Sequence, residues 1–151
     1  DAVRTALSYL AGIVSPGDAG AWTTWSPTWT NLTVGNGTVV AKYHKIGRTV
    51  AFRLFVTCGS TTSVGTAPIF TLPVAAASDY FGEHTIGSGT LLDHGTKAWI
   101  GAPQIVVSDP TKAYVRADGG DGGWQNTSAT VPFTWTTNDK IMLTGTYEAA
   151  S

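Results

Sequence analysis

The side chains best suited to acid–base or metal chemistry are three histidines, and none of them has a partner at catalytic or metal-ligand spacing. His44 lies in a basic segment, His84 follows Glu83, and His94 follows Asp93. An enzyme needs a nucleophile beside a base, a pair of carboxylates, or a cluster of metal ligands such as the HExxH pattern. We therefore interpret these histidines as hydrogen-bonded or solvent-exposed turn residues. The sequence predicts no catalytic residue and no enzymatic activity.

A glycine-rich run with two carboxylates, residues 118–123 with the sequence DGGDGG, is the next candidate. Calcium takes carboxylate and carbonyl oxygens from flexible loops, so Asp118 and Asp121 have the chemistry of calcium ligands. The EF-hand pattern is absent, however, and two aspartates are few for such a site. We interpret this run as a mobile loop or a contact between subunits, since so many glycines do not form regular structure. We predict no metal and no cofactor.

Trp124 directly follows this run and precedes the amides of Gln125 and Asn126. A sugar site uses an exposed aromatic ring beside amides, because the ring stacks on the sugar face while the amides bond its hydroxyls. A ring in the core or in a subunit interface is the alternative, and the commoner one. Trp124, Gln125 and Asn126, with Asp118 and Asp121, are therefore the candidate ligand-binding residues.

The elements that must position these residues belong to one β-rich domain. Of the 151 residues, 42% are hydrophobic, only 13% are charged, and 18 are glycine. This composition is typical of short strands joined by tight turns. The formal net charge is −1 and the nine lysines and arginines are scattered along the chain. Nucleic-acid-binding proteins cluster their cations, so we predict no nucleic-acid partner.

Local features narrow the class further. The basic cluster in residues 42–48 flanks a predicted turn and is interpreted as a solvated hairpin end. Cys58 is the single cysteine, so no intrachain disulfide forms, and its place at the end of an apolar strand predicts a buried thiol. No apolar run approaches the ~18 residues of a membrane span, which predicts no membrane insertion. The chain begins at Asp1 rather than Met, which indicates a processed chain or a fragment.

Residues 2–14 have helical spacing. The apolar residues that recur at intervals of three and four, as in the a/d seam of a coiled coil, are Val3, Leu7, Leu10 and Val14. A helix this short is marginal alone in water. It must pack on copies of itself, as the end of a bundle or stalk, or on its own β-domain. We predict a helix for oligomerisation or anchoring at 1–15 and a linker at 16–27, whose Trp22 and Trp25 seal the helix against the β-domain or a subunit interface.

The β-domain is predicted over residues 28–151. In the strand at 49–58, Val50, Phe52, Leu54 and Val56 alternate with the residues of the other face. The predicted strands are 29–33, 38–46, 49–58, 69–72, 86–92, 97–100, 104–107, 113–116, 131–135 and 140–147. Hairpin turns are expected at Gly35-Asn36, Gly47-Arg48 and His94-Gly95. This spacing predicts an all-β fold, an antiparallel and jelly-roll-like β-sandwich with a short N-terminal helix.

Residues 25–73 and 143–148 resemble a module common in tailed phages of actinobacteria. The motifs that carry the resemblance are WSPTW at the start, a GNG turn, a tyrosine followed by IGRTV, a Phe-containing strand, a GSTT loop, a Leu-Pro stop and the closing LTGTYE. The resemblance implies a virion-surface protein, either a tail-fibre or minor tail protein tip or a capsid decoration protein. It also implies a homotrimer, with which the heptad seam agrees.

The sequence and the resemblance together favour a non-enzymatic structural protein on the phage virion surface. As a tail-fibre tip it would bind the host cell-wall glycan as a receptor; as a capsid decoration protein it would stabilise the shell. A free carbohydrate-binding module is the alternative from another class. The expected partners are two further copies of the chain, other virion proteins and host glycan. The expected location is the virion surface, after synthesis in the bacterial cytoplasm.

Overall fold

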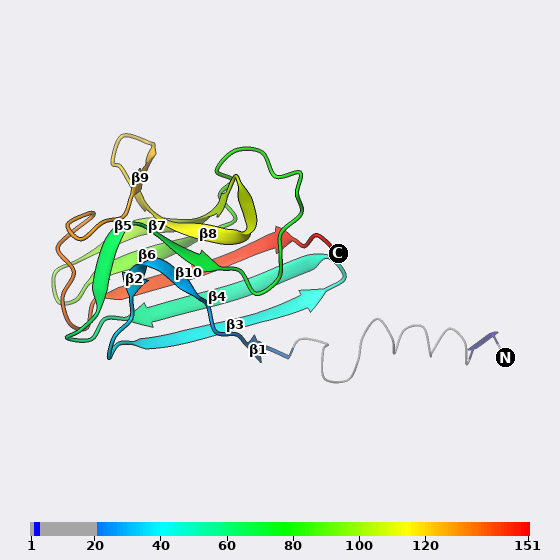
Figure 1. Cartoon of the computed structure of the whole chain (residues 1–151), viewed down its shortest axis with the longest axis horizontal. Helices are drawn as coiled ribbons and strands as arrows, with labels where there is room; N and C mark the ends of the chain where they lie inside the picture. The colour runs from blue at the N-terminus through cyan, green and yellow to red at the C-terminus, as the bar shows by residue number, and fades with distance from the viewer. Residues whose placement is uncertain (1, 4–20) are drawn as a thin grey trace.

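The computed structural model describes residues 2–3 and 21–151, and the described domain is all-β (Figure 1). Its strands are β1 (Thr23–Thr24), β2 (Trp29–Thr33), β3 (Thr38–Ile46), β4 (Thr49–Thr57), β5 (Ser63–Thr71), β6 (Gly87–Asp93), β7 (Lys97–Val106), β8 (Asp109–Asp118), β9 (Trp124–Asn126) and β10 (Lys140–Glu148). Within these residues no helix has the length and apolar character that a membrane span requires. Of the predicted helical seam, Val3 is exposed, while Leu7, Leu10 and Val14 lie outside the described residues.

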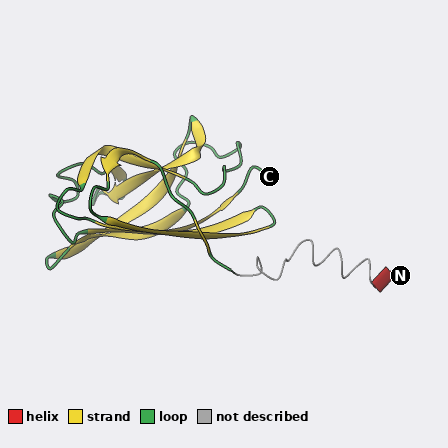
Figure 2. Ribbon diagram, turned by 60° about the horizontal axis from the view of Figure 1, so that its bottom comes forward, coloured by secondary structure: helices red, strands yellow, loops and turns green. Residues whose placement is uncertain are grey.

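All strands pair antiparallel in one continuous sheet of order β1-β3-β4-β10-β6-β7-β8-β5-β2, and β9 pairs with β8 outside this order. The sheet curls into a half-barrel, so that its β5–β2 end folds over the long strands (Figure 2). β10 joins the two halves, because it pairs with β4 along nine residues and with β6 along six. The antiparallel all-β prediction is confirmed, whereas a jelly-roll sandwich of two separate sheets is not.

The core lies inside the curl and is built from the alternating strands. Val50, Phe52, Leu54 and Val56 of β4 are fully buried, as the alternation predicts. On β10, Ile141, Leu143 and Tyr147 are buried on the same side. Between them, Gly145 leaves room for an aromatic ring, since a Cβ there would lie 2.5 Å from Phe52 Cε1. The Phe52 ring in turn packs 6.2 Å from the ring of Phe70 on the folded-over end of the sheet.

The three predicted turns all form, but only two of them close hairpins. β3 pairs with β4 around Gly47, and β6 pairs with β7 around Gly95. Gly35 adopts a positive φ of 58°, yet β2 pairs with β5 rather than with β3. The Gly35-Asn36 turn instead docks on the β4–β5 loop, where Thr61 N–H donates to Asn36 Oδ1 at 2.9 Å and Asn36 N–H donates to Thr61 Oγ1 at 2.8 Å.

Several predicted boundaries change for identifiable reasons. Residues 131–135 are not a strand, because the rings of Phe133 and Trp135 pack on each other, with centroids 4.4 Å apart. β7 is one strand where two were predicted, and β5 begins at Ser63, within the predicted loop. Part of the predicted linker joins the sheet, since β1 pairs with β3 and Trp25 N–H donates to the Ala41 carbonyl.

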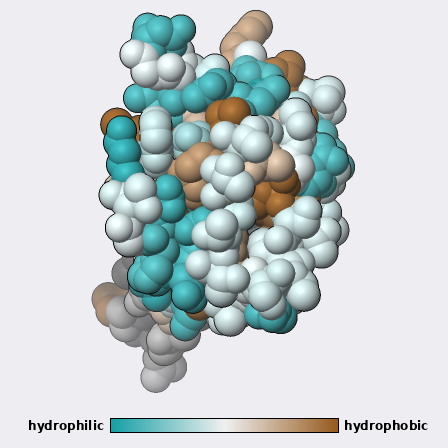
Figure 3. Space-filling view, turned by 90° about the vertical axis from the view of Figure 1, so that its left-hand side faces the viewer, coloured by the Kyte–Doolittle hydropathy of each residue, from teal (hydrophilic) through white to brown (hydrophobic). Residues whose placement is uncertain are grey.

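The end of the domain that carries the 127–139 loop has a weakly polar surface. Residues of intermediate hydropathy predominate there and hydrophobic side chains form separate spots (Figure 3). This agrees with a sequence in which Gly, Ser and Thr replace charged residues.

The buried carboxylate of Asp139 organises this end, because its Oδ1 accepts the N–H of His94 at 2.8 Å and its Oδ2 accepts the hydroxyl of Thr136 at 3.2 Å.

Candidate functional site

The predicted ligand-binding residues lie together on the hairpin that joins β8 to β9. Trp124 opens β9 directly opposite Asp118, and its side chain is 43% exposed. The Gln125 amide is already engaged, since its Nε2 donates to the Asp118 carbonyl at 3.0 Å. Asn126 is exposed on the same strand. The structure therefore brings the five residues into one hairpin, with an exposed ring and one engaged amide.

The two aspartates of this hairpin shape its turn. Asp118 Oδ1 accepts the Gly120 N–H at 3.0 Å, and Asp121 Oδ1 accepts the Gly123 N–H at the same distance. Gly120 and Gly122 have φ values of 80° and 88°, which favour glycine. The described residues contain no group of three or more His, Cys, Asp or Glu side chains that could hold a metal ion. The run forms the turn of the β8–β9 hairpin, and each carboxylate accepts a backbone N–H there.

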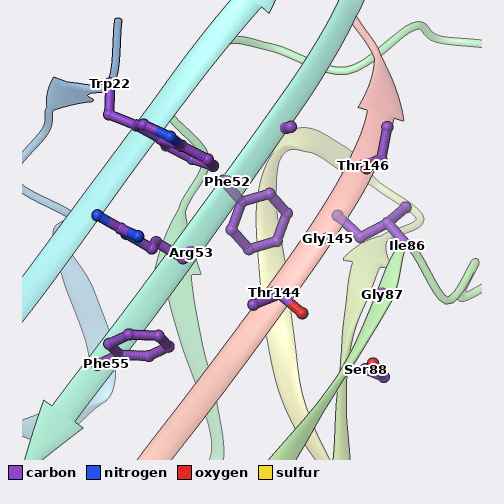
Figure 4. Close-up of a pocket in the computed structure, with 11 residues that line it drawn as sticks. Trp22, Phe52, Arg53, Phe55, Ile86, Gly87, Ser88, Thr144, Gly145 and Thr146 are labelled. Atoms are coloured by element: carbon purple, nitrogen blue, oxygen red, sulfur yellow. The ribbon is translucent and has the colours of Figure 1, made fainter. Parts of the chain in front are cut away.

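A second candidate lies on the outer face of the sheet, across β4, β10 and β6. A hollow of about 650 Å³ opens there beside Trp22. Figure 4 shows Trp22, Arg53 and Phe55 in a row along one side, with the hydroxyl-bearing residues on the other. The polar residues of that side are Ser88, Thr144 and Thr146. The hollow thus combines aromatic rings, a guanidinium and hydroxyl groups.

Strand alternation and register explain how this hollow forms. Because Phe52 and Leu54 point into the core, Ala51, Arg53 and Phe55 must point outward. The register places Thr144 of β10 opposite both Arg53 of β4 and Ser88 of β6. Backbone alone forms the floor where Gly145 pairs with Gly87. Small residues between larger side chains therefore leave a depression on this face of the sheet.

Trp22 reaches this face because β1 extends the sheet beyond β3. Its ring lies edge-on to His44 at 4.7 Å and stacks over the Arg53 guanidinium, with Cζ 4.9 Å from the ring centroid. Beside this ring, Arg53 Nε and His44 Nδ1 are buried and have no hydrogen-bond partner among the described residues. The Arg53 guanidinium therefore lies between Trp22 and Phe55 and stacks on the Trp22 ring (Figure 4).

The segment before Ile86, a residue that lines the hollow, is tied to the sheet by a partly buried polar network. Arg116 Nη2 lies 2.7 Å from Glu83 Oε1, and Arg116 Nε donates to Gln104 Oε1 at 3.2 Å. Gln104 Nε2 then donates to Thr85 Oγ1 at 2.9 Å. Arg116 and Gln104 are both buried, so removing one partner would leave a buried polar group unpaired. This network clamps the segment before Ile86 to the sheet and so sets the position of the hollow's border.

Among the remaining reactive groups that the structure describes, only His44 lies beside a candidate site, against the Trp22 ring. Cys58 is buried, as predicted, and burial together with the charge of Asp139 raises the pKa of its thiol to about 11. Hydrogen bonds from Lys112 and Thr111 lower the pKa of Asp109 to about 2. His84 and His94 are exposed, while His44 is partly buried beneath Trp22 and lies on β3 rather than in a turn.

The sequence indicated the hairpin candidate but missed the hollow. Its only signal was the outward row of β4, which places Arg53 and Phe55 on the same face of one strand. Trp22 was assigned to the linker, and nothing local indicates that β10 lies beside β4.

Comparison of the chain with protein families, with curated proteins and with solved structures found no match. The geometry of the two candidates therefore carries the functional argument.

Proposed function

We propose that the protein is a non-enzymatic, glycan-binding module of the phage virion surface, the receptor-binding tip of a tail fibre. The observation that carries the glycan-binding part is the hollow beside Trp22. A pyranose has an apolar face that stacks on an aromatic ring and hydroxyls that need hydrogen-bond partners. Trp22 and Phe55 offer the rings, while Ser88, Thr144 and Thr146 offer the hydroxyls. The tail-fibre and virion-surface parts are supported by the sequence resemblance.

The residues around the hollow favour binding over catalysis. Glycoside hydrolysis uses two carboxylates that flank the scissile bond. Among the described residues that line the hollow, none is a carboxylate or a histidine. A saccharide in this place would meet hydroxyl groups, a guanidinium and aromatic rings, which hold a ligand without cleaving it.

The test is retention on an immobilised cell-wall polysaccharide fraction from an actinobacterium. We expect Trp22→Ala to lower the affinity at least about tenfold, because the stacking ring and the cover of Arg53 are lost together. Trp124→Ala is the matched control, since it removes an equally exposed ring and should retain binding. The reverse result would move the site to the β8–β9 hairpin. Wild-type protein that binds no such fraction would contradict the proposal and favour capsid decoration.

The assembly belongs to the same proposal. We infer that residues 2–14 form the helix that the seam predicts, that three such helices associate, and that the β-domains project outward as jelly-roll-like sandwiches. The curl supports the layered shape, because Trp25 Nε1 donates across it to the Thr71 carbonyl at 3.2 Å. Light scattering should give about three times 15.8 kDa, and a Leu7→Asp, Leu10→Asp variant should dissociate. A monomeric wild type at micromolar concentration would contradict the trimer.

A further inference from the structure

We propose that the saccharide bound beside Trp22 is acidic, carrying a carboxylate or phosphate group that Arg53 holds. The inference rests on the proposed glycan-binding function and names the class of its ligand. It is carried by two cations on the outer sheet face, Lys42 and Arg53, which have no carboxylate partner among the described residues.

The cations lie in one cross-strand row. Lys42 of β3 is directly opposite Arg53 of β4, and Arg53 is opposite Thr144 of β10, which is opposite Ser88 of β6. Directly paired residues share a face of the sheet. The row therefore runs from two cations to two hydroxyls over roughly 14 Å, given ~4.8 Å between neighbouring strands. An extended ligand that lies along this row meets a positive end and a neutral end.

The two cations are not neutralised by neighbours. Like charges directly opposite each other weaken a sheet. Among the described residues the ion pairs are Arg48–Glu148, Lys112–Asp109 and Arg116–Glu83, so neither Lys42 nor Arg53 has a carboxylate partner. Glu148 lies on the same outer face but pairs with Arg48, at 3.2 Å. The sheet thus keeps an unfavourable pair beside the hollow, and a bound anion would relieve it.

Arg53 is also prepared for an anion by its orientation. Trp22 covers one face of the guanidinium, with Cζ 4.9 Å from the ring centroid, and Nε is buried without a hydrogen-bond partner among the described residues. A guanidinium offers a planar fork of N–H donors that matches carboxylate and phosphate oxygens. Stacking fixes the plane of this fork, so that less side-chain freedom is lost when the anion binds. The indole beside it supplies the stacking surface for the sugar ring that carries the acid.

The charge pattern is local, which favours an acidic saccharide over nucleic acid. The whole chain has a formal net charge of −1, and duplex binding needs many phosphate contacts along an extended basic surface. Two cations beside rings and hydroxyls suit one or two acidic sugar units. Binding of a single-stranded oligonucleotide as tight as that of the acidic sugar would overturn this assignment.

The experiment compares acidic saccharides with their neutral counterparts, using the full chain and the fluorescence of its tryptophans. The first pair is trigalacturonic acid and its methyl ester; the second is glucose 1-phosphate and glucose. We expect the acid of at least one pair to bind at least about tenfold more tightly than its neutral partner, with the difference shrinking in about 500 mM salt. A preference within the first pair identifies a carboxylate ligand and one within the second a phosphate; either supports the proposal.

Variants separate the charge from the stacking surface. Arg53→Gln should abolish the preference for the acid while weak binding of the neutral partner persists, whereas Trp22→Ala should weaken both. Lys97→Gln is the matched control, because it removes the same charge from the distant β6–β7 hairpin, where Lys97 Nζ lies 4.1 Å from the centroid of the Trp99 ring.

Two failures can be told apart. Equal binding of acid and neutral partner, unchanged in Arg53→Gln, would overturn the acidic ligand and leave the glycan-binding function standing. A wild-type protein that binds neither pair and is not retained on cell-wall polysaccharide would overturn both. Equal loss of preference in Arg53→Gln and Lys97→Gln would show that net charge, not the hollow, selects the anion.

Discussion

The hollow beside Trp22 and the β8–β9 hairpin both present a tryptophan, with 40% of Trp22 and 43% of Trp124 exposed, yet they are built differently. The hollow takes its residues from strands far apart in the sequence, on a face backed by the core. The hairpin is held by hydrogen bonds between residues two to seven positions apart. An exposed ring therefore does not define a site; what surrounds the ring does.

The largest difference between the two regions is expected in the stability lost when one glycine of each region is replaced by alanine. Gly145→Ala should lower the free energy of unfolding by about 3 kcal/mol, because its Cβ would lie 2.5 Å from Phe52 Cε1 and 2.6 Å from the Ile86 carbonyl oxygen. Gly122→Ala should cost about 1 kcal/mol, since it meets no atom within 4 Å but has a φ of 88°. Urea denaturation measures both values. Equal losses would show that the hollow's floor is no more tightly packed than the hairpin.

A smaller effect is expected when the hollow is filled. Ala51→Trp should lower the affinity for cell-wall polysaccharide about tenfold, because Ala51 is a short side chain on its floor. Its stability should stay within about 0.5 kcal/mol of the wild type, since aromatic residues suit strands. Ala98→Trp, on an exposed position of β7, is the control for an added ring. Wild-type affinity in Ala51→Trp would place the site elsewhere.

Shortening the hairpin should matter less. Replacing residues 119–123 with Asn-Gly keeps the paired ends Asp118 and Trp124 and offers a turn that suits two-residue hairpins. Affinity for the polysaccharide should stay within about twofold of the wild type, a difference of about 0.4 kcal/mol. The same retention assay measures it. A large loss would show that the hairpin contributes to binding.

The smallest effect is expected from calcium. An ion that binds the folded state alone would stabilise it by an amount that grows with the logarithm of the ion concentration relative to its dissociation constant. Because Asp118 and Asp121 each already accept a backbone N–H, the melting temperature in millimolar calcium and in chelator should differ by less than about 1 °C. Thermal unfolding under the two conditions measures this difference. A rise of several degrees that disappears in Asp121→Asn would reveal a calcium site in the hairpin.

Features that depend on local order could be predicted from the sequence. The buried faces of β4 and β10 follow from alternation, because neighbouring side chains of a strand point to opposite sides. The turns at Gly47 and Gly95 follow from the positive φ that glycine permits. The segment 131–135 shows the limit of this reasoning: its apolar residues are consistent with a strand, but Phe133 and Trp135 are held in a loop, where Trp135 Nε1 donates to the Ser128 carbonyl at 3.0 Å.

Features that depend on which strands are neighbours could not be predicted. Hydrogen bonding places β10 between β4 and β6, so Thr144 meets Arg53 and Ser88. Pairing of β1 with β3 extends the sheet beyond β3 and places Trp22 over Arg53. Alternation shows that Arg53 points outward but not what lies beside it, because backbone hydrogen bonds between distant segments select strand partners and register. The composition and strand faces of this domain are thus local properties, while its hollow is a product of long-range pairing.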